Sequence, residues 1–572
     1  MSAIWPALAC MLVYFIGYRF YSARLSRRLF RLDDRRETPA HRFRNDVDYL
    51  PTSRYVLFGH HFASITGLSP MLGPAIAVIW GWLPAMIWVV LGAVFIGCVH
   101  DFSALVLSIR ANGSSIGKVC EGVIGARAKG LFLALIFFGV ALAMGVFTLV
   151  IARLFAGNYG TAVIPSGGLM LVAAAIGWLA HKRGIPWGRL TIVGFALQLT
   201  LVCLGSEFPI EWSDSKGWMV LLLIYALAAS VLPVWSLLQP RDFLNSLLLY
   251  LGLVLCYIGF FAKAPEFAAP AFEPEPPGAP PLYPFVFITI ACGAASGFHA
   301  LVSSGTTAKQ LNRESDARFV GYGGMLGESL LGLLAVLATT AGVAASKGED
   351  ARTAWSRHYA DWHAASGLGA KMGRFIDGAA GFMAELGVPM SLAVSLVAVI
   401  VVSFALTTLD SATRLLRYNV EEVGASLGWS RLTGNRYFSS LVAVAAIAGF
   451  AFYQIDGKPA GMALWAIFGT VNQLLAGLTL LTVTLWLRQR GRNPWYTGLP
   501  MAFMLITTAI AMVSNLKNFS NSWTFQDVEG KAIAWPLLIS AIGIAILGTW
   551  MIVEAVLAMA RRDQKSSGTA PS

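Results

Sequence analysis

The chain has 572 residues, of which 56% are hydrophobic and 13% are charged, about half the charged share of a soluble domain. A soluble fold could not bury that much apolar surface, so the composition excludes an ordinary soluble enzyme. The net charge of +12 would suit nucleic acid only if the basic residues gathered on one solvated face. They lie instead in short segments between apolar runs, which is typical of cytoplasmic loops in a membrane protein.

Apolar runs near 20 residues, the length that crosses about 30 Å of hydrocarbon, recur along the chain. The first run lacks a preceding basic region and a small-residue cleavage site, so we interpret it as a retained span and not as a signal peptide. An all-α integral membrane fold with about 15 transmembrane helices is predicted. The expected spans are 3–23, 57–80, 83–109, 130–155, 164–181, 190–206, 218–236, 245–262, 284–304, 319–345, 387–408, 437–454, 461–487, 498–515 and 535–558.

The distribution of Lys and Arg predicts the orientation of these spans. The segment from Arg24 to Arg54 is strongly basic and therefore cytoplasmic, which places the N-terminus outside and the C-terminus in the cytoplasm. The predicted organisation is an N-terminal membrane helix (1–23), a basic cytoplasmic loop (24–56), a transport core (57–408), a second cytoplasmic loop (409–436), C-terminal membrane helices (437–558) and a cytoplasmic tail (559–572).

With these sides assigned, the set formed by the second to sixth spans begins at the cytoplasmic side, and the set formed by the seventh to eleventh begins at the outer side. The first helix of each set carries a helix-breaking motif, at Gly67 to Pro74 in one and around Pro233 in the other. Paired interrupted helices in two inverted halves are typical of a transporter's central site. Pro and Gly are also common in membrane helices generally, so chance remains an alternative to a five-plus-five inverted-repeat core.

Polar side chains at membrane depth cost about 2.5 to 3.5 kcal/mol each, so each should face a cavity or a partner. Those around the two interruptions are candidate substrate-binding residues: His61, Ser64, Thr66, Gly67, Ser69, Gly73, Pro233 and Trp235. Those that could take up a proton or a hard cation are candidate ion-coupling residues: Asp101, His299, Ser303, Ser304, Thr307 and Glu328.

Structural interpretations of these residues stay open. The hydroxyl groups could simply bond to carbonyl oxygens one turn back, the histidines near residue 60 could pack at the membrane interface, and Arg110 could pair with Asp101. The sequence predicts no metal site, because no HExxH or other paired ligand spacing occurs. It predicts no cofactor, and the six cysteines suggest neither disulfides nor zinc.

Several long segments carry a resemblance to a known family. They are TPAHRFRNDVDYLPT (from Thr38), FGHHFASITGLSPMLGP (from Phe58), LPVWSLLQPRDF (from Leu232), FITIACGAASGFHALVSSGTT (from Phe287), GYGGMLGES (from Gly321) and FGTVNQLLAG (from Phe468). These segments closely resemble the carbon starvation protein A (CstA) family, from about residue 10 to about residue 490. Two features differ from the family pattern: the connection 346–386 is short, and a VQDF-like segment reads VHDF at Val99 to Phe102.

The resemblance implies a carrier of the bacterial cytoplasmic (inner) membrane, of the leucine-transporter (LeuT) type, that is induced when carbon runs short. Family members are described as peptide transporters and, in some cases, as proton-coupled pyruvate importers. We therefore expect a secondary transporter of pyruvate or small peptides with a coupled cation, most simply a proton, and not an enzyme. A membrane nutrient sensor that retains the carrier fold is the alternative. The expected partners are the solute, the ion and lipid, with no nucleic acid; the oligomeric state stays open.

Overall fold

The computed structural model describes the chain except for residues 158, 344–349, 367, 453, 456–457, 460–464, 525–527 and 568–572. Eleven of the described helices are long and apolar enough to cross a membrane, and a twelfth span is formed if one bent pair is counted. Parts of five predicted segments, the span 319–345, the connection 346–386, the spans 437–454 and 461–487 and the tail 559–572, lie outside the described residues.

The structure is almost entirely helical. Its helices are α1 (Ile4–Ile16), α2 (Ser22–Arg24), α3 (Pro39–Arg42), α4 (Arg54–Ile65), α5 (Ser69–Ala77), α6 (Trp82–Ile87), α7 (Cys98–Arg110), α8 (Ile116–Val123), α9 (Ala126–Ala156), α10 (Val163–Arg183), α11 (Trp187–Glu207), α12 (Ser215–Val231), α13 (Leu238–Lys263), α14 (Leu282–Thr289), α15 (Ala291–Ala294), α16 (Gly297–Gly305), α17 (Gly323–Thr340), α18 (Ala351–His358), α19 (Trp362–Ser366), α20 (Leu368–Ala384), α21 (Met390–Ser426), α22 (Ser430–Thr433), α23 (Arg436–Phe452), α25 (Trp465–Gln489), α26 (Trp495–Thr524) and α27 (Val528–Ser567). Two-residue strands β1 (Gln454–Ile455) and β2 (Lys458–Pro459) form the one described sheet.

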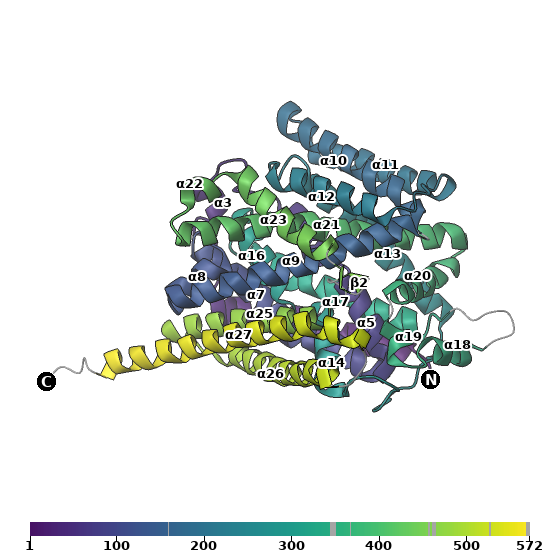
Figure 1. Ribbon diagram of the computed structural model, residues 1–572. Coiled ribbons are helices and arrows are strands. Elements are labelled where there is room, and N and C mark those ends of the chain that lie inside the picture. The colour runs from purple at the N-terminus through teal and green to yellow at the C-terminus, as the bar shows by residue number, and fades with distance from the viewer. Residues whose placement is uncertain are drawn as a thin grey trace.

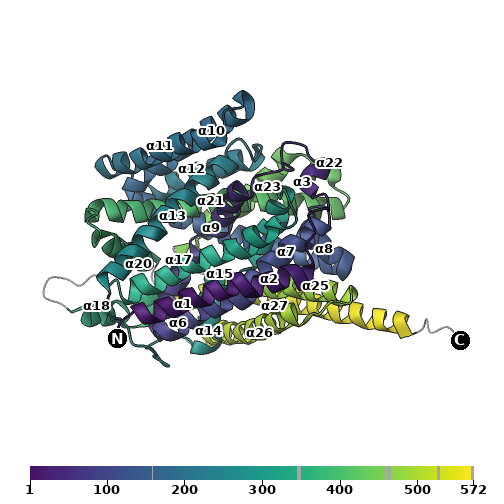
Figure 2. The same cartoon turned by 180° about the vertical axis from the view of Figure 1, so that it is seen from behind.

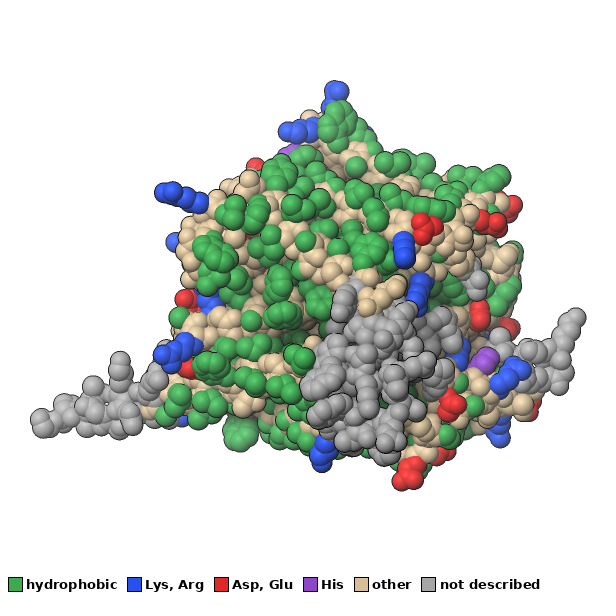
Figure 3. Space-filling view, in the orientation of Figure 1, with side chains coloured by type: hydrophobic (Ala, Val, Ile, Leu, Met, Phe, Trp, Pro, Cys, Tyr) green, Lys and Arg blue, Asp and Glu red, His purple; other side chains and the backbone are tan. Residues whose placement is uncertain are grey.

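Burial divides the helices into a centre and a periphery. In α9, 83% of the residues in the most apolar stretch of the helix are buried, and in α21 the share is 89%. In α11 it is only 28%. Helices α10 and α11 form one edge of the bundle in Figure 1, and α1 crosses the opposite face in Figure 2. Hydrophobic side chains cover much of the surface in Figure 3, and charged ones gather mainly toward its margins. An apolar surface of this kind suits lipid as the solvent.

Three helices differ in extent from the sequence-based prediction. The first helical stretch continues to Phe30, beyond the predicted boundary at residue 23. Helix α21 continues to Ser426 and so includes most of the predicted loop 409–436, because buried partners compensate its polar residues. The predicted connection 346–386 contains α20, whose Phe375 and Phe382 are buried.

Two spans are broken by short stretches of extended backbone. Helix α4 ends at Ile65, Thr66 is extended, and α5 begins at Ser69 with a bend of 50° between the two helical pieces. The second broken span is α14, α15 and α16, with extended backbone at Ala295 and Ser296. A Cβ atom on Gly73 would lie only 3.1 Å from Ile290 Cα, so the two broken spans are in direct contact.

The second interruption is therefore not where the sequence placed it. Helix α12 ends at Val231, and Pro233 lies in the connection to α13, not inside a helix. The prediction failed because residues 232–236 were included in a span whose helix ends at Val231. Six predicted spans, not four, separate the two broken spans, so a strict five-plus-five count does not account for the second break.

Candidate functional site

A small cavity lies between the two broken spans, α9, α21 and α25. It measures about 30 Å³, room for about two water molecules. Gly67 and Ser69 line it from the first break and Cys292 from the second. The remaining walls are Ile65, Gly139, Val140, Ala143, Met144, Phe147, Phe298, Leu301, Thr408, Phe468, Val471, Asn472 and Leu475. The site is mostly apolar with a few polar groups, as small-molecule sites commonly are.

The first break leaves backbone donors unused beside this cavity. The N–H groups of Gly67, Leu68 and Ser69 make no hydrogen bond to a residue that the structure describes. The Oγ1 atom of buried Thr66 also has no partner among them. Free N–H groups at the start of a helix favour an anion, so the start of α5 suits a carboxylate.

The second break is held by Asn472 on α25. Its Oδ1 accepts hydrogen bonds from Ser296 Oγ and from the backbone N–H of Phe298, both at 3.1 Å. The start of α16 thus has a side-chain partner, whereas the start of α5 has none among the described residues. The two breaks therefore differ in their capacity to bind an anion.

The first buried ionisable group, the Asp101 cluster, joins three helices. His299 on α16 lies between Asp101 on α7 and Glu328 on α17, with Nδ1 2.9 Å from Asp101 Oδ2 and Nε2 3.1 Å from Glu328 Oε2. The Glu328 contact lies off the direction of a good hydrogen bond, since neither atom has a hydrogen-bond partner among the described residues. His100 Nδ1 lies 2.8 Å from Asp101 Oδ1. All four side chains are fully buried.

Charge balance in the Asp101 cluster depends on bound protons. With both carboxylates ionised and both histidines neutral, the cluster would carry two uncompensated negative charges inside the membrane. Such charges are costly at this depth, and each proton taken up cancels one of them. The three sequence candidates Asp101, His299 and Glu328 are thus brought together, and Arg110 is not their partner because it pairs with Glu314 at 2.6 Å.

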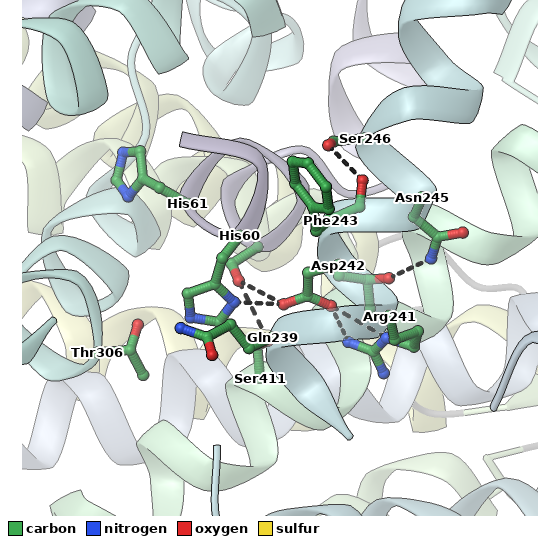
Figure 4. A network of polar contacts seen from close by, with 12 residues as sticks. His60, His61, Gln239, Arg241, Asp242, Phe243, Asn245, Ser246, Thr306 and Ser411 are labelled. Atoms are coloured by element: carbon green, nitrogen blue, oxygen red, sulfur yellow. Dashed lines mark hydrogen bonds and ion pairs between the residues drawn. The ribbon is translucent and has the colours of Figure 1, made fainter. Parts of the chain in front are cut away.

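A second buried group, the Arg241 network, connects α4, α13 and α21 (Figure 4). Arg241 on α13 forms ion pairs with Asp242 and with Asp410 on α21. Asp242 Oδ2 lies 2.6 Å from His60 Nδ1 and accepts a longer hydrogen bond, 3.4 Å, from Ser64 Oγ. Ser64 is therefore part of this network and not of the cavity.

The Arg241 network was missed as a site from sequence. The eighth span was expected to begin at residue 245, which left Arg241 and Asp242 in a loop. The structure begins α13 at Leu238 and buries both side chains. The signal that could have found them is the run Gln239 to Asp242, where a cation and an anion directly precede an apolar stretch.

The remaining candidate residues on α4 and α16 lie outside both buried groups. His61 Nδ1 lies 2.8 Å from Thr307 Oγ1, which connects α4 to the end of the second broken span. Ser304 Oγ donates to the Ala300 carbonyl one turn back and accepts from the Ile116 N–H, so the structural interpretation holds for it. Ser303 is buried with no described partner for its Oγ.

Trp235 does not contribute to the central cavity. Its ring stacks on His181 of α10, with the ring centroids 4.0 Å apart. Neither Trp235 nor Pro233 lines the cavity. Their assignment to substrate binding depended on an interrupted seventh span, and the structure ends α12 at Val231 instead.

Many membrane-spanning helices, two broken spans in contact and buried ionisable groups beside them define a multi-pass membrane transport protein. The family model for the carbon starvation protein CstA matches residues 2–354 and 353–511. The chain belongs to this family.

Relatives with assigned names agree with this membership. The chain is 32% identical to the peptide transporter CstA of Campylobacter jejuni, with 89% of this chain and 79% of that protein covered. It is 30% identical to the pyruvate/proton symporter BtsT of Escherichia coli, with 93% and 83% covered. A manganese transporter structure from Eremococcus coleocola matches 90% of this chain and 99% of that one, at 12% identity and a TM-score of 0.45.

Proposed function

We propose that this protein is a secondary transporter that moves pyruvate or a small peptide into the cell together with a proton. The Asp101 cluster carries this proposal. It lies at membrane depth, holds two carboxylates and two imidazoles, and connects the second broken span to α7 and α17. The family name supports a role in nutrient uptake when carbon is limiting.

Protonation would change how these three helices are held together. When His299 is charged, it attracts Asp101 and Glu328 at the same time and holds α16 between them. Loss of the proton removes that attraction and leaves the two carboxylates to repel each other. Because α16 is part of a broken span beside the cavity, proton binding and helix position are coupled, which is the requirement for symport.

A proton is favoured over sodium by the composition of the cluster. Imidazole changes charge near neutral pH, whereas sodium prefers several oxygen ligands. The oxygen-rich alternative uses Ser303 and Thr307, but Thr307 already bonds to His61. If sodium were the driver, Ser303→Ala and Thr307→Ala should raise the sodium concentration needed for half-maximal uptake.

We propose the start of α5 as the site for the substrate carboxylate. The unused N–H groups at Gly67 to Ser69 and the helix dipole support this assignment. The cavity of about 30 Å³ is too small for either solute, so Phe147 or a neighbouring wall residue must move on binding. Two broken spans of opposite direction also support an inverted-repeat core with additional helices between its halves.

Reconstitution tests the proposal. The purified protein in proteoliposomes should accumulate labelled pyruvate or dialanine when the interior is alkaline, and much less when the pH gradient is collapsed with an ionophore. Uptake that follows an imposed sodium gradient and ignores the pH gradient would contradict proton coupling. The absence of uptake of both solutes would contradict the proposed function.

A further inference from the structure

A second and larger cavity lies directly beyond the central one. It measures about 340 Å³ and is enclosed by α8, α9, α16 and α21. Leu301 lines both cavities. On α9 the second cavity is lined by Ile136 and the central one by Val140, which is one helical turn away. The two cavities are thus stacked along the helix axes with Leu301 between them.

The second cavity lies at the end of the bundle that carries the basic connections. Tyr49, Asn419 and Glu422 line it, and the sequence predicts their segments, 24–56 and 409–436, to be cytoplasmic. A solute that leaves the central cavity past Leu301 would enter this space next. Its volume is in the range of about 300 to 1,000 Å³ typical of small-molecule sites.

Two acceptor oxygens without a described partner and the side chain of Lys309 line this space. Buried Asn419 donates from Nδ2 to the Leu133 carbonyl, but its Oδ1 has no described partner. Glu422 Oε2 is also buried without one. Lys309 Nζ lies 4.1 Å from the centre of the Tyr418 ring and also acts on the Asp48 carboxylate, whose pKa it helps to lower. Buried polar atoms are normally satisfied, so the oxygens of Asn419 and Glu422 suggest a ligand that carries a positively charged hydrogen-bond donor.

We propose that the second cavity is a transit site for a zwitterionic solute, a small peptide with a free α-ammonium group and a free carboxylate. Glu422 and Asn419 accept hydrogen bonds from the ammonium group, and Lys309 forms an ion pair with the carboxylate. Pyruvate has no ammonium group to satisfy Glu422, so it would occupy only the Lys309 half of the site. The inference rests on the proposed transport function and selects peptide over pyruvate as the substrate class.

The test measures dialanine uptake by proteoliposomes and its inhibition by N-acetyl-dialanine and by dialanine amide. The wild-type protein should prefer free dialanine over both analogues. In Glu422→Gln the preference over the N-acetyl analogue should fall about tenfold, and in Lys309→Met the preference over the amide should fall similarly, because each variant removes one charged group that binds the solute. Glu121→Gln and Lys129→Met, which disrupt an ion pair at the same end of the bundle, should retain both preferences.

Labelling gives a result that does not depend on transport. Ala425 lines the mouth of the second cavity and is exposed. In an Ala425→Cys variant with exposed Cys203 changed to Ser, dialanine at about ten times its dissociation constant should slow thiol labelling about tenfold. Unchanged labelling, or unchanged preferences in Glu422→Gln and Lys309→Met, would overturn the transit site. Wild-type uptake of pyruvate without dialanine would overturn it while leaving the proposed function intact, whereas uptake of neither would overturn both.

Discussion

His60 and His61 are neighbours in the chain but bind partners on opposite sides of α4. His60 Nδ1 lies 2.6 Å from Asp242 Oδ2, and His61 Nδ1 lies 2.8 Å from Thr307 Oγ1. Figure 4 shows His60 directed into the Arg241 network and His61 directed away from it. Helix α4 leads into the first break, so a rotation of α4 that separates one histidine from its partner also disturbs the other histidine.

Removal of Arg241 should strongly destabilise the protein. Arg241→Met leaves Asp242 and Asp410 buried without a counterion, and loss of one partner of a buried pair costs about 3–5 kcal/mol. Thermal unfolding in detergent would measure this loss. Lys263→Met is the matched control, because its pair with Glu385 is well exposed and should contribute less than about 1 kcal/mol. Equal small effects of both variants would show that the Arg241 network is not a buried ionic centre.

A bulky residue at Gly67 should block uptake without preventing membrane insertion. A Cβ atom there would lie 3.0 Å from the Phe147 ring and 3.1 Å from Thr408 Oγ1. Overpacking costs about 1–3 kcal/mol, so uptake by Gly67→Leu should fall roughly tenfold or more. Gly167→Leu on α10, where a Cβ meets no atom within 4 Å, should transport normally. Normal uptake by Gly67→Leu would remove the first break from the substrate path.

Asp48 should stabilise the protein in a pH-dependent way. Burial would raise the pKa of this carboxyl group, but Lys309, the Tyr418 hydroxyl, Arg414 and Arg417 hold the pKa below its usual value. The stabilisation is therefore complete above the ordinary pKa of 3.8 and is lost as the pH falls through the lower folded-state value.

At pH 7, Asp48→Asn should lower the free energy of unfolding by about 1–3 kcal/mol, the range for a hydrogen bond that involves a charged group. The difference from the wild type should shrink at strongly acid pH. Exposed Glu266 is the control, and Glu266→Gln should have little effect at either pH. A difference that is independent of pH would contradict the electrostatic origin.

The N-terminus should lie outside the cell. Ser2 pairs with Glu266 of the acidic connection between α13 and α14, so one measurement reports on that end of the bundle. A Ser2→Cys variant should react with an impermeant thiol reagent in intact cells, relative to a background without accessible cysteine. Labelling only after lysis would reverse the predicted orientation.

The spans followed from apolar runs because lipid requires about 20 apolar residues in a row, and polar residues inside those runs led directly to Asp101, His299 and Glu328. The position of the second break could not be predicted from the sequence, because neither the extended backbone at Ala295 nor the capping by Asn472 is visible in a local pattern. Asp410 lay just beyond the predicted span 387–408, and its role depends on Arg241, 169 positions away. Interactions across such distances in sequence are set by packing, which one sequence alone does not reveal.

His299→Ala in proteoliposomes tests proton coupling through the Asp101 cluster most directly. Two rates are compared in the same preparation: accumulation of the substrate driven by a pH gradient, and exchange of labelled for unlabelled substrate without a gradient. Exchange needs no net movement of the proton, so His299→Ala should lose most accumulation and retain exchange, whereas His181→Ala on peripheral α10 should retain both. Accumulation by His299→Ala at the wild-type level, with an unchanged dependence on pH, would contradict the account.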